Sequence, residues 1–203
     1  MRAARLKIGL KIFLTLAFQI LLVFQIQAGE STGRGGFMVG FQSGYGRLNL
    51  RSDQGDDLTR RTYSMGLQGG YAVTSRVILG LEVNGWLLEP FNWHDEEKGE
   101  AVNNTMLLLH VFPIERQPVY LRAALGRAGY TANAPEKQGG SGWGSWLAGI
   151  GYEISPSQHF YIAAQISYGR GNYSDVPDIL GRVTGRRYRV ADISLALRWY
   201  TRR

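Results

Sequence analysis

The stretch GFMVGFQSGYG, residues 36–46, alternates between two kinds of side chain with a period of two. One parity is rich in glycine and includes Gln42. The other parity carries Phe37, Val39, Phe41, Ser43 and Tyr45. Successive side chains of a β-strand point to opposite faces, so this stretch predicts a strand with one apolar face and one face of small and polar residues.

The same alternation recurs along the rest of the chain, and the segments between follow a rule of length. The pattern predicts eight strands, at residues 36–47, 60–71, 77–87, 101–112, 119–130, 144–153, 159–171 and 187–200. Short connections, at 72–76, 113–118 and 154–158, alternate with long ones at 48–59, 88–100, 131–143 and 172–186. This is typical of an all-β protein, an eight-stranded up-and-down antiparallel transmembrane β-barrel with short periplasmic turns and four long extracellular loops.

The first 28 residues have the pattern of a secretory signal peptide, which leaves residues 29–203 as the barrel domain. Four basic residues (Arg2, Arg5, Lys7 and Lys11) precede an apolar run at 12–24, which is too short to span a bilayer as a helix. Without these four residues the formal net charge falls from +7 to +3. The basic balance is therefore poor support for nucleic-acid binding, and we expect no nucleic-acid partner.

The polar residues predict which face of the strands meets lipid. Only two lysines follow the signal peptide, Lys98 and Lys137, and both lie in long connections, whereas a soluble barrel would cover its outside with charge. The charges well inside the strands all fall on the glycine-rich parity; they are Glu82, Arg122, Asp192 and Arg198. We therefore expect the apolar parity to face the lipid of a bacterial outer membrane and the polar parity to fill the lumen.

Aromatic residues of the apolar parity gather at both ends of the strands, which predicts two interfacial girdles. The girdle at the short-turn end is Phe37, Tyr71, Tyr152, Phe160 and Trp199. The girdle at the long-loop end is Tyr45, Tyr63, Trp146 and Tyr168.

The N-terminal signal, the eight alternating strands, the glycine-rich face and the closing strand ADISLALRWY at 191–200 resemble the small outer-membrane barrels typified by the OmpA transmembrane domain and OmpX. The resemblance covers the chain after its signal and implies a monomer placed in the membrane by the barrel insertion machinery. That machinery reads a terminal aromatic in this group. The present chain departs from the pattern, because Thr201, Arg202 and Arg203 follow Tyr200.

The charged residues suggest two further features. In the lumen, we expect Glu82 and Asp192 to be neutralised by Arg122 and Arg198, with Arg122 as the partner of Glu82, because an unpaired charge in so narrow an interior is costly. At the long-loop end, arginines on the lipid-facing parity predict a collar that contacts lipopolysaccharide phosphates, since the guanidinium fork binds phosphate oxygens. The collar is Arg47, Arg61, Arg127, Arg170 and Arg189.

We therefore expect a non-enzymatic barrel that acts in envelope integrity or surface interaction, with a possible extracellular ligand at its loops. Two alternatives are a lipid A-modifying enzyme and a small diffusion pore. The enzyme would need a base near the outer leaflet, and only His94 lies there, in a loop beside Asp95. No cysteine is present, and the acidic run at 51–57 lacks the spacing of a calcium loop, so we expect neither cofactor nor metal.

Overall fold

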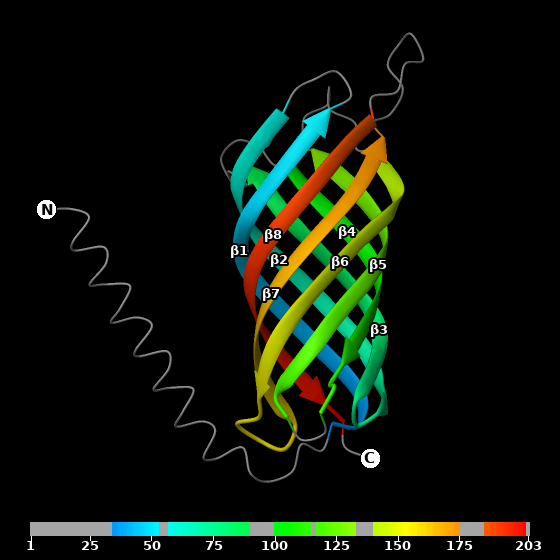
Figure 1. Ribbon diagram of the computed structural model, residues 1–203, viewed down its shortest axis with the longest axis vertical. Coiled ribbons are helices and arrows are strands. Elements are labelled where there is room, and N and C mark those ends of the chain that lie inside the picture. Colours follow the sequence, from blue (N-terminus) through cyan, green and yellow to red (C-terminus); the bar gives the residue numbers. More distant parts are fainter. Residues whose placement is uncertain are drawn as a thin grey trace, which may run out of the picture. The chain divides into compact units, whose positions relative to one another are not determined.

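A computed structural model describes residues 34–52, 57–89, 100–114, 117–132, 140–174 and 185–201 of the chain. The predicted signal peptide lies outside these ranges. The strands are β1 (Gly36–Ser52), β2 (Asp57–Thr74), β3 (Val77–Glu89), β4 (Glu100–Val111), β5 (Val119–Ala132), β6 (Ser141–Ile154), β7 (Phe160–Ser174) and β8 (Gly185–Tyr200). They form a closed barrel in chain order, with every neighbouring pair antiparallel (Figure 1). The predicted fold class is confirmed.

Closure of the barrel pairs the first strand with the last. Along β1 and β8, Gly40 lies opposite Arg198 and Gly46 lies opposite Asp192. Thr201 extends the closure past β8, because its backbone N–H donates to the carbonyl of Phe37 over 2.8 Å. No strand edge of the described barrel is left unpaired. The backbone N–H and C=O groups that cross the hydrocarbon can therefore be hydrogen-bonded within the protein, as a membrane requires.

Glycine on the inner face allows the strands to carry large polar side chains in a narrow lumen. A Cβ at Gly44 would lie 2.5 Å from the Cβ of Ser194, closer than atoms can approach. A Cβ at Gly80 would lie 2.3 Å from the carbonyl oxygen of Gly69. At these positions glycine allows the adjacent strands to approach closely.

The outer wall is apolar over most of its height. Val39, Leu81, Leu107 and Ile193 are 59%, 57%, 69% and 64% exposed and lie on four different strands. A soluble monomer does not present an apolar surface of this extent to water. The protein is a transmembrane β-barrel, and barrels with short turns at one end and long connections at the other belong to the bacterial outer membrane. Within the described ranges, no helix has the length and hydropathy needed to cross a bilayer.

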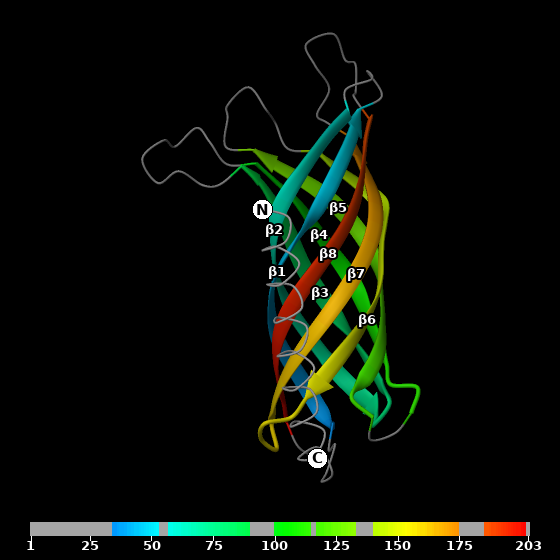
Figure 2. The same cartoon turned by 60° about the vertical axis from the view of Figure 1, so that its left-hand side comes forward.

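At the exterior end the strands are longer than the alternation predicts. β1 continues to Ser52 and β2 begins at Asp57, so their connection is only 53–56 instead of 48–59, and both strands rise high in Figure 2. The alternation along β1 continues beyond Tyr45, but there the apolar side chains face the lumen and the charged ones face outward. Leu48 and Leu50 are buried in the lumen, while Arg47 is exposed outside. We call the strand ends beyond the aromatics Tyr45, Tyr63, Trp146 and Tyr168 the exterior zone and the remainder the membrane zone.

Candidate functional site

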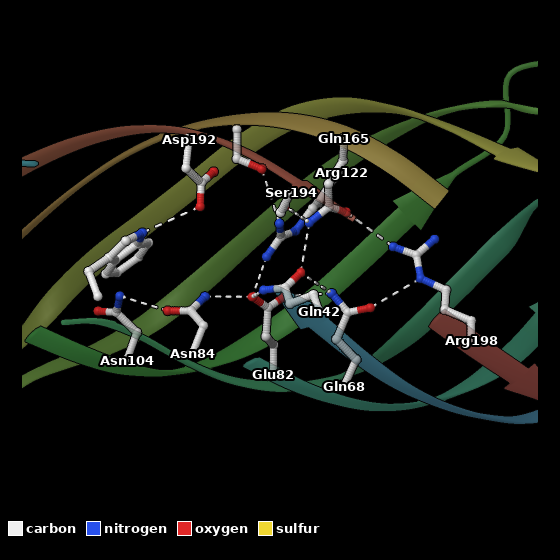
Figure 3. A network of polar contacts seen from close by, with 12 residues as sticks. Gln42, Gln68, Glu82, Asn84, Asn104, Arg122, Gln165, Asp192, Ser194 and Arg198 are labelled. Carbon is white, nitrogen blue, oxygen red and sulfur yellow. Dashed lines mark hydrogen bonds and ion pairs between the residues drawn. The ribbon is translucent and has the colours of Figure 1, made fainter. Parts of the chain in front are cut away.

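The centre of the lumen is a polar network around the carboxylate of Glu82, which is fully buried (Figure 3). Arg122 reaches it from β5 as an ion pair. Amide groups complete its shell: Gln42 Nε2 donates over 2.9 Å, Gln68 Nε2 over 3.1 Å and Asn84 Nδ2 over 2.5 Å. These side chains come from β1, β2, β3 and β5, so a single carboxylate joins four strands across the barrel.

The network continues toward the exterior through Asn104 and ends at an aromatic layer. Asn104 Nδ2 donates to Asn84 Oδ1 over 3.1 Å, and Asn104 Oδ1 accepts from the hydroxyl of Tyr188 over 2.7 Å. Asp192 accepts a hydrogen bond of 3.3 Å from Trp86 Nε1. The rings of Trp86 and Tyr188 lie 5.9 Å apart. Above this layer the buried side chains include Leu48, Leu50 and Leu88, and Arg60 donates to the carbonyl of Leu88.

A second charged cluster closes the periplasmic end. Arg198 donates to Glu153 over 2.7 Å and to the hydroxyl of Tyr120 over 2.9 Å. Arg34, which precedes β1, binds the other oxygen of Glu153 over 2.9 Å, and its guanidinium lies 3.6 Å from the ring centre of Phe112. Glu153 therefore holds two arginines, and the cluster joins residues that are far apart in the sequence.

All four residues predicted for the lumen charge network lie inside the barrel, but their partners differ. Arg122 pairs with Glu82. Arg198 pairs with Glu153, and Asp192 is held by Trp86. The alternation could have placed Glu153 inside, since it follows the outward Tyr152. Arg34 lies before the first strand, where alternation gives no face.

The charges buried in the described lumen balance. The acids are Glu82, Glu153 and Asp192, and the arginines are Arg34, Arg122 and Arg198. The formal charges of these six groups therefore sum to zero, which lowers the cost of burying them in a narrow space, although Glu153 binds two of the arginines and Asp192 is held by Trp86.

Histidines give no acid–base site at the outer leaflet in the described part of the chain. His110 is buried in the lumen near the periplasmic end, with its ring 4.9 Å from that of Tyr120. His159 lies at a periplasmic turn, where Nδ1 is 3.0 Å from the carbonyl oxygen of Tyr200. His94 lies outside the described residues, as does most of the acidic run. No cluster of described His, Asp or Glu side chains could hold a metal ion.

The nine aromatics predicted for the two girdles all lie on the outer wall, and several form edge-to-face pairs between neighbouring strands. The rings of Phe37 and Tyr71 are 5.2 Å apart at the periplasmic end. At the exterior end, Tyr45 lies 5.1 Å from Tyr63, and Trp146 lies 5.7 Å from Tyr168. Trp143, which the alternation left in a loop, is also outside, 76% exposed.

The five predicted exterior arginines are exposed on the outer wall, but they do not form a collar. The strand register brings four of them together on β2, β1, β8 and β7, where Arg47 faces Arg61 and Arg170 faces Arg189. Arg127 lies apart, on β5, and bonds to the hydroxyl of Ser141. Alternation sets only the face of each arginine, so the predicted ring is corrected to a one-sided group. We call Arg47, Arg61, Arg170 and Arg189 the arginine patch.

No family model and no curated protein matches the sequence. Solved structures do match the fold. Neisserial surface protein A is 16% identical over 83% of this chain and 99% of its own, with a TM-score of 0.51. This similarity shows that the present chain has the fold of the small outer-membrane barrels. Ail of Yersinia pestis (12% identity, 81% and 99% covered, TM-score 0.46) and OprG of Pseudomonas aeruginosa (13%, 83% and 98%, 0.45) also match.

Proposed function

We propose that this protein is a closed, non-enzymatic barrel of the Gram-negative outer membrane that acts in envelope integrity or surface interaction. The observation that carries the proposal is the filled lumen. From Arg34 at the periplasmic end to Asn104 toward the exterior, buried charged and amide side chains bond to one another across the barrel. Ions could pass only if these pairs separated, which would leave charges uncompensated in a narrow interior.

With the lumen occupied, two surfaces remain for interaction. One is the apolar wall, which meets lipid, and the other is the exterior zone, where arginines point outward. Envelope integrity and surface interaction fit this arrangement better than transport or catalysis. Transport would require a path through the barrel, and catalysis would require a reactive group in it. We expect the protein to work as a monomer, since a closed barrel leaves no strand edge to pair with a second copy.

Conductance of a planar bilayer tests the closed lumen. The purified wild-type barrel is expected to leave the membrane conductance unchanged. A matched variant with Glu82→Ala and Arg122→Ala removes the central ion pair and is expected to raise it. A steady channel conductance in the wild type would favour the diffusion pore over the proposed function.

Comparison of cells with and without the protein tests the remaining alternatives. We expect the mass spectrum of lipid A to be the same in both strains, and the uptake of a hydrophobic dye to rise when the protein is absent. A change in the acyl chains or phosphates of lipid A that depends on the protein would identify a lipid A-modifying enzyme instead.

A further inference from the structure

The arginine patch places like charges directly opposite each other, which a β-sheet does not favour without a counter-ion. Arg47 and Arg61 are register partners on β1 and β2, and Arg170 and Arg189 are partners on β7 and β8. Like charges in such positions repel and destabilise the sheet. No described carboxylate forms an ion pair with any of the four. The patch is therefore complementary to an anion that comes from outside the protein.

The register also sets the distance between the two arginine pairs. Arg47 faces Ala191 on β8, and Arg189 lies two residues further along β8, opposite Asn49. With about 4.8 Å between strands and about 3.3 Å per residue, the centres of the two pairs lie roughly 12 Å apart. The strands are tilted relative to the long axis of the barrel (Figure 1), so a step along β8 changes the height as well as the separation of the two pairs.

The Arg47–Arg61 pair borders one hollow in the exterior zone, and Arg170 of the second pair borders another. One hollow, of about 510 Å³, is lined by Arg47 and Arg61 together with Tyr45 and Thr59. The other, of about 400 Å³, is lined by Arg170 and Arg187 beside Trp146. Between the pairs the register places the small Ala191 and the polar Asn49. The surface thus offers two cationic hollows, with a small and a polar side chain between the two arginine pairs.

The aromatic girdle fixes the level of the patch in the bilayer. Arg47 and Arg61 each lie two residues beyond Tyr45 and Tyr63, whose rings are in contact, and Arg170 lies two residues beyond Tyr168. Aromatic girdles mark the boundary between hydrocarbon and headgroups, so the guanidinium groups lie at the level of lipid phosphates. Nothing equivalent exists at the other end, since no described arginine lies on the outer wall of the strands' periplasmic halves.

We propose that the arginine patch binds one lipid molecule of the outer leaflet whose disaccharide headgroup carries a phosphate at each end, as lipid A does. One phosphate occupies the Arg47–Arg61 pair, the other occupies the Arg170–Arg189 pair, and the sugars lie over Ala191. A lipid with one phosphate reaches only one pair. The proposal rests on the outer-membrane placement in the proposed function and adds a defined, one-sided lipid site to it.

The test combines variants of each arginine pair with lipids that carry one or two phosphates. The refolded full barrel is studied in phosphatidylcholine vesicles that contain bisphosphorylated lipid A, monophosphorylated lipid A or phosphatidylglycerol, and bound lipid is counted by native mass spectrometry. We expect the wild type to bind the bisphosphorylated form at least about tenfold more tightly than the monophosphorylated form, because a phosphate gains bidentate, charge-assisted hydrogen bonds from its arginine pair.

The variants Arg47→Gln with Arg61→Gln and Arg170→Gln with Arg189→Gln are each expected to lose this preference, because the second phosphate then has no partner. Arg127→Gln is the matched control: it removes an exposed exterior arginine outside the patch and is expected to keep the preference. Equal binding of the two lipid A forms by the wild type would overturn the proposal, as would an equal loss in the control.

Two further outcomes are distinguishable. Failure of the wild type to fold in vesicles, seen as identical migration of heated and unheated samples, would contradict the membrane barrel and not the lipid site alone. Equally tight binding of a soluble sulfated oligosaccharide to the patch of a folded barrel would overturn the lipid assignment in favour of an extracellular polyanion.

Discussion

The membrane zone and the exterior zone of this barrel use the same strands with opposite polarity. In the membrane zone Leu81 faces outward and Glu82 faces the lumen. In the exterior zone Leu48 and Leu50 face the lumen, and Arg47 faces outward. Along β1 the register with both neighbouring strands continues without a shift through this boundary. What changes is the surrounding solvent. Apolar side chains can face outward where the wall meets hydrocarbon, but they are buried in the lumen where the wall meets headgroups and water.

The two interiors differ in what holds them together. The membrane zone holds the ion pairs and amides, where each group depends on its partner, beside apolar side chains such as Met106 and Leu108. In the exterior zone the buried side chains are mostly apolar or aromatic, such as Leu48, Leu50 and Tyr173, and Arg60 also donates to the carbonyl of Leu88. Removing one polar group in the membrane zone should therefore lower the free energy of unfolding by leaving its partner unpaired. Removing an apolar side chain in the exterior zone should lower it by leaving a cavity.

The largest effect is expected from breaking the central ion pair. Arg122→Met leaves the Glu82 carboxylate buried without a cation and should lower the free energy of unfolding by about 3 to 5 kcal/mol. Adding Glu82→Gln should recover part of this loss, because no buried charge then remains at the centre. Reversible urea unfolding from phospholipid vesicles measures both. Additive effects of the two substitutions would show that the pair is not coupled.

A smaller difference should separate two leucines in the two zones. Leu48→Ala, at a fully buried position of the exterior zone, should cost about 2 to 5 kcal/mol through the cavity it leaves. Leu81→Ala, at a position 57% exposed to lipid, should cost much less, because lipid tails fill the space. The same unfolding measurement applies. Equal costs would mean that the polarity of the wall does not invert between the zones.

The smallest effect concerns the outer wall of the exterior zone. In vesicles of phosphatidylcholine alone, Arg47→Gln should raise the free energy of unfolding by about 0.2 to 1 kcal/mol, because it removes the repulsion with Arg61. Added salt should shrink the gain, since exposed charges are screened. A loss of stability in these vesicles would indicate that the two arginines support the fold without an anion.

Much of the fold could be predicted from the order of residues alone. Period-two alternation set the strand number and the face of each side chain, because that period follows from the pleat of any strand. The same rule placed Glu82, Arg122, Asp192 and Arg198 in the lumen and the five exterior arginines on the wall. It failed at residues 48–52, where alternation continues but the apolar side chains change face, and the strand was predicted to end early.

Contacts between strands required the folded barrel. Alternation gives each side chain a face but no partner, because the partner depends on the register of each hairpin and on the stagger with which β8 closes on β1. That register joins Arg198 to Glu153 and gathers Arg47, Arg61, Arg170 and Arg189 on one side. The chemistry of each residue is therefore local to the chain, whereas the sites they form arise from closure, which brings distant strands to fixed neighbouring positions.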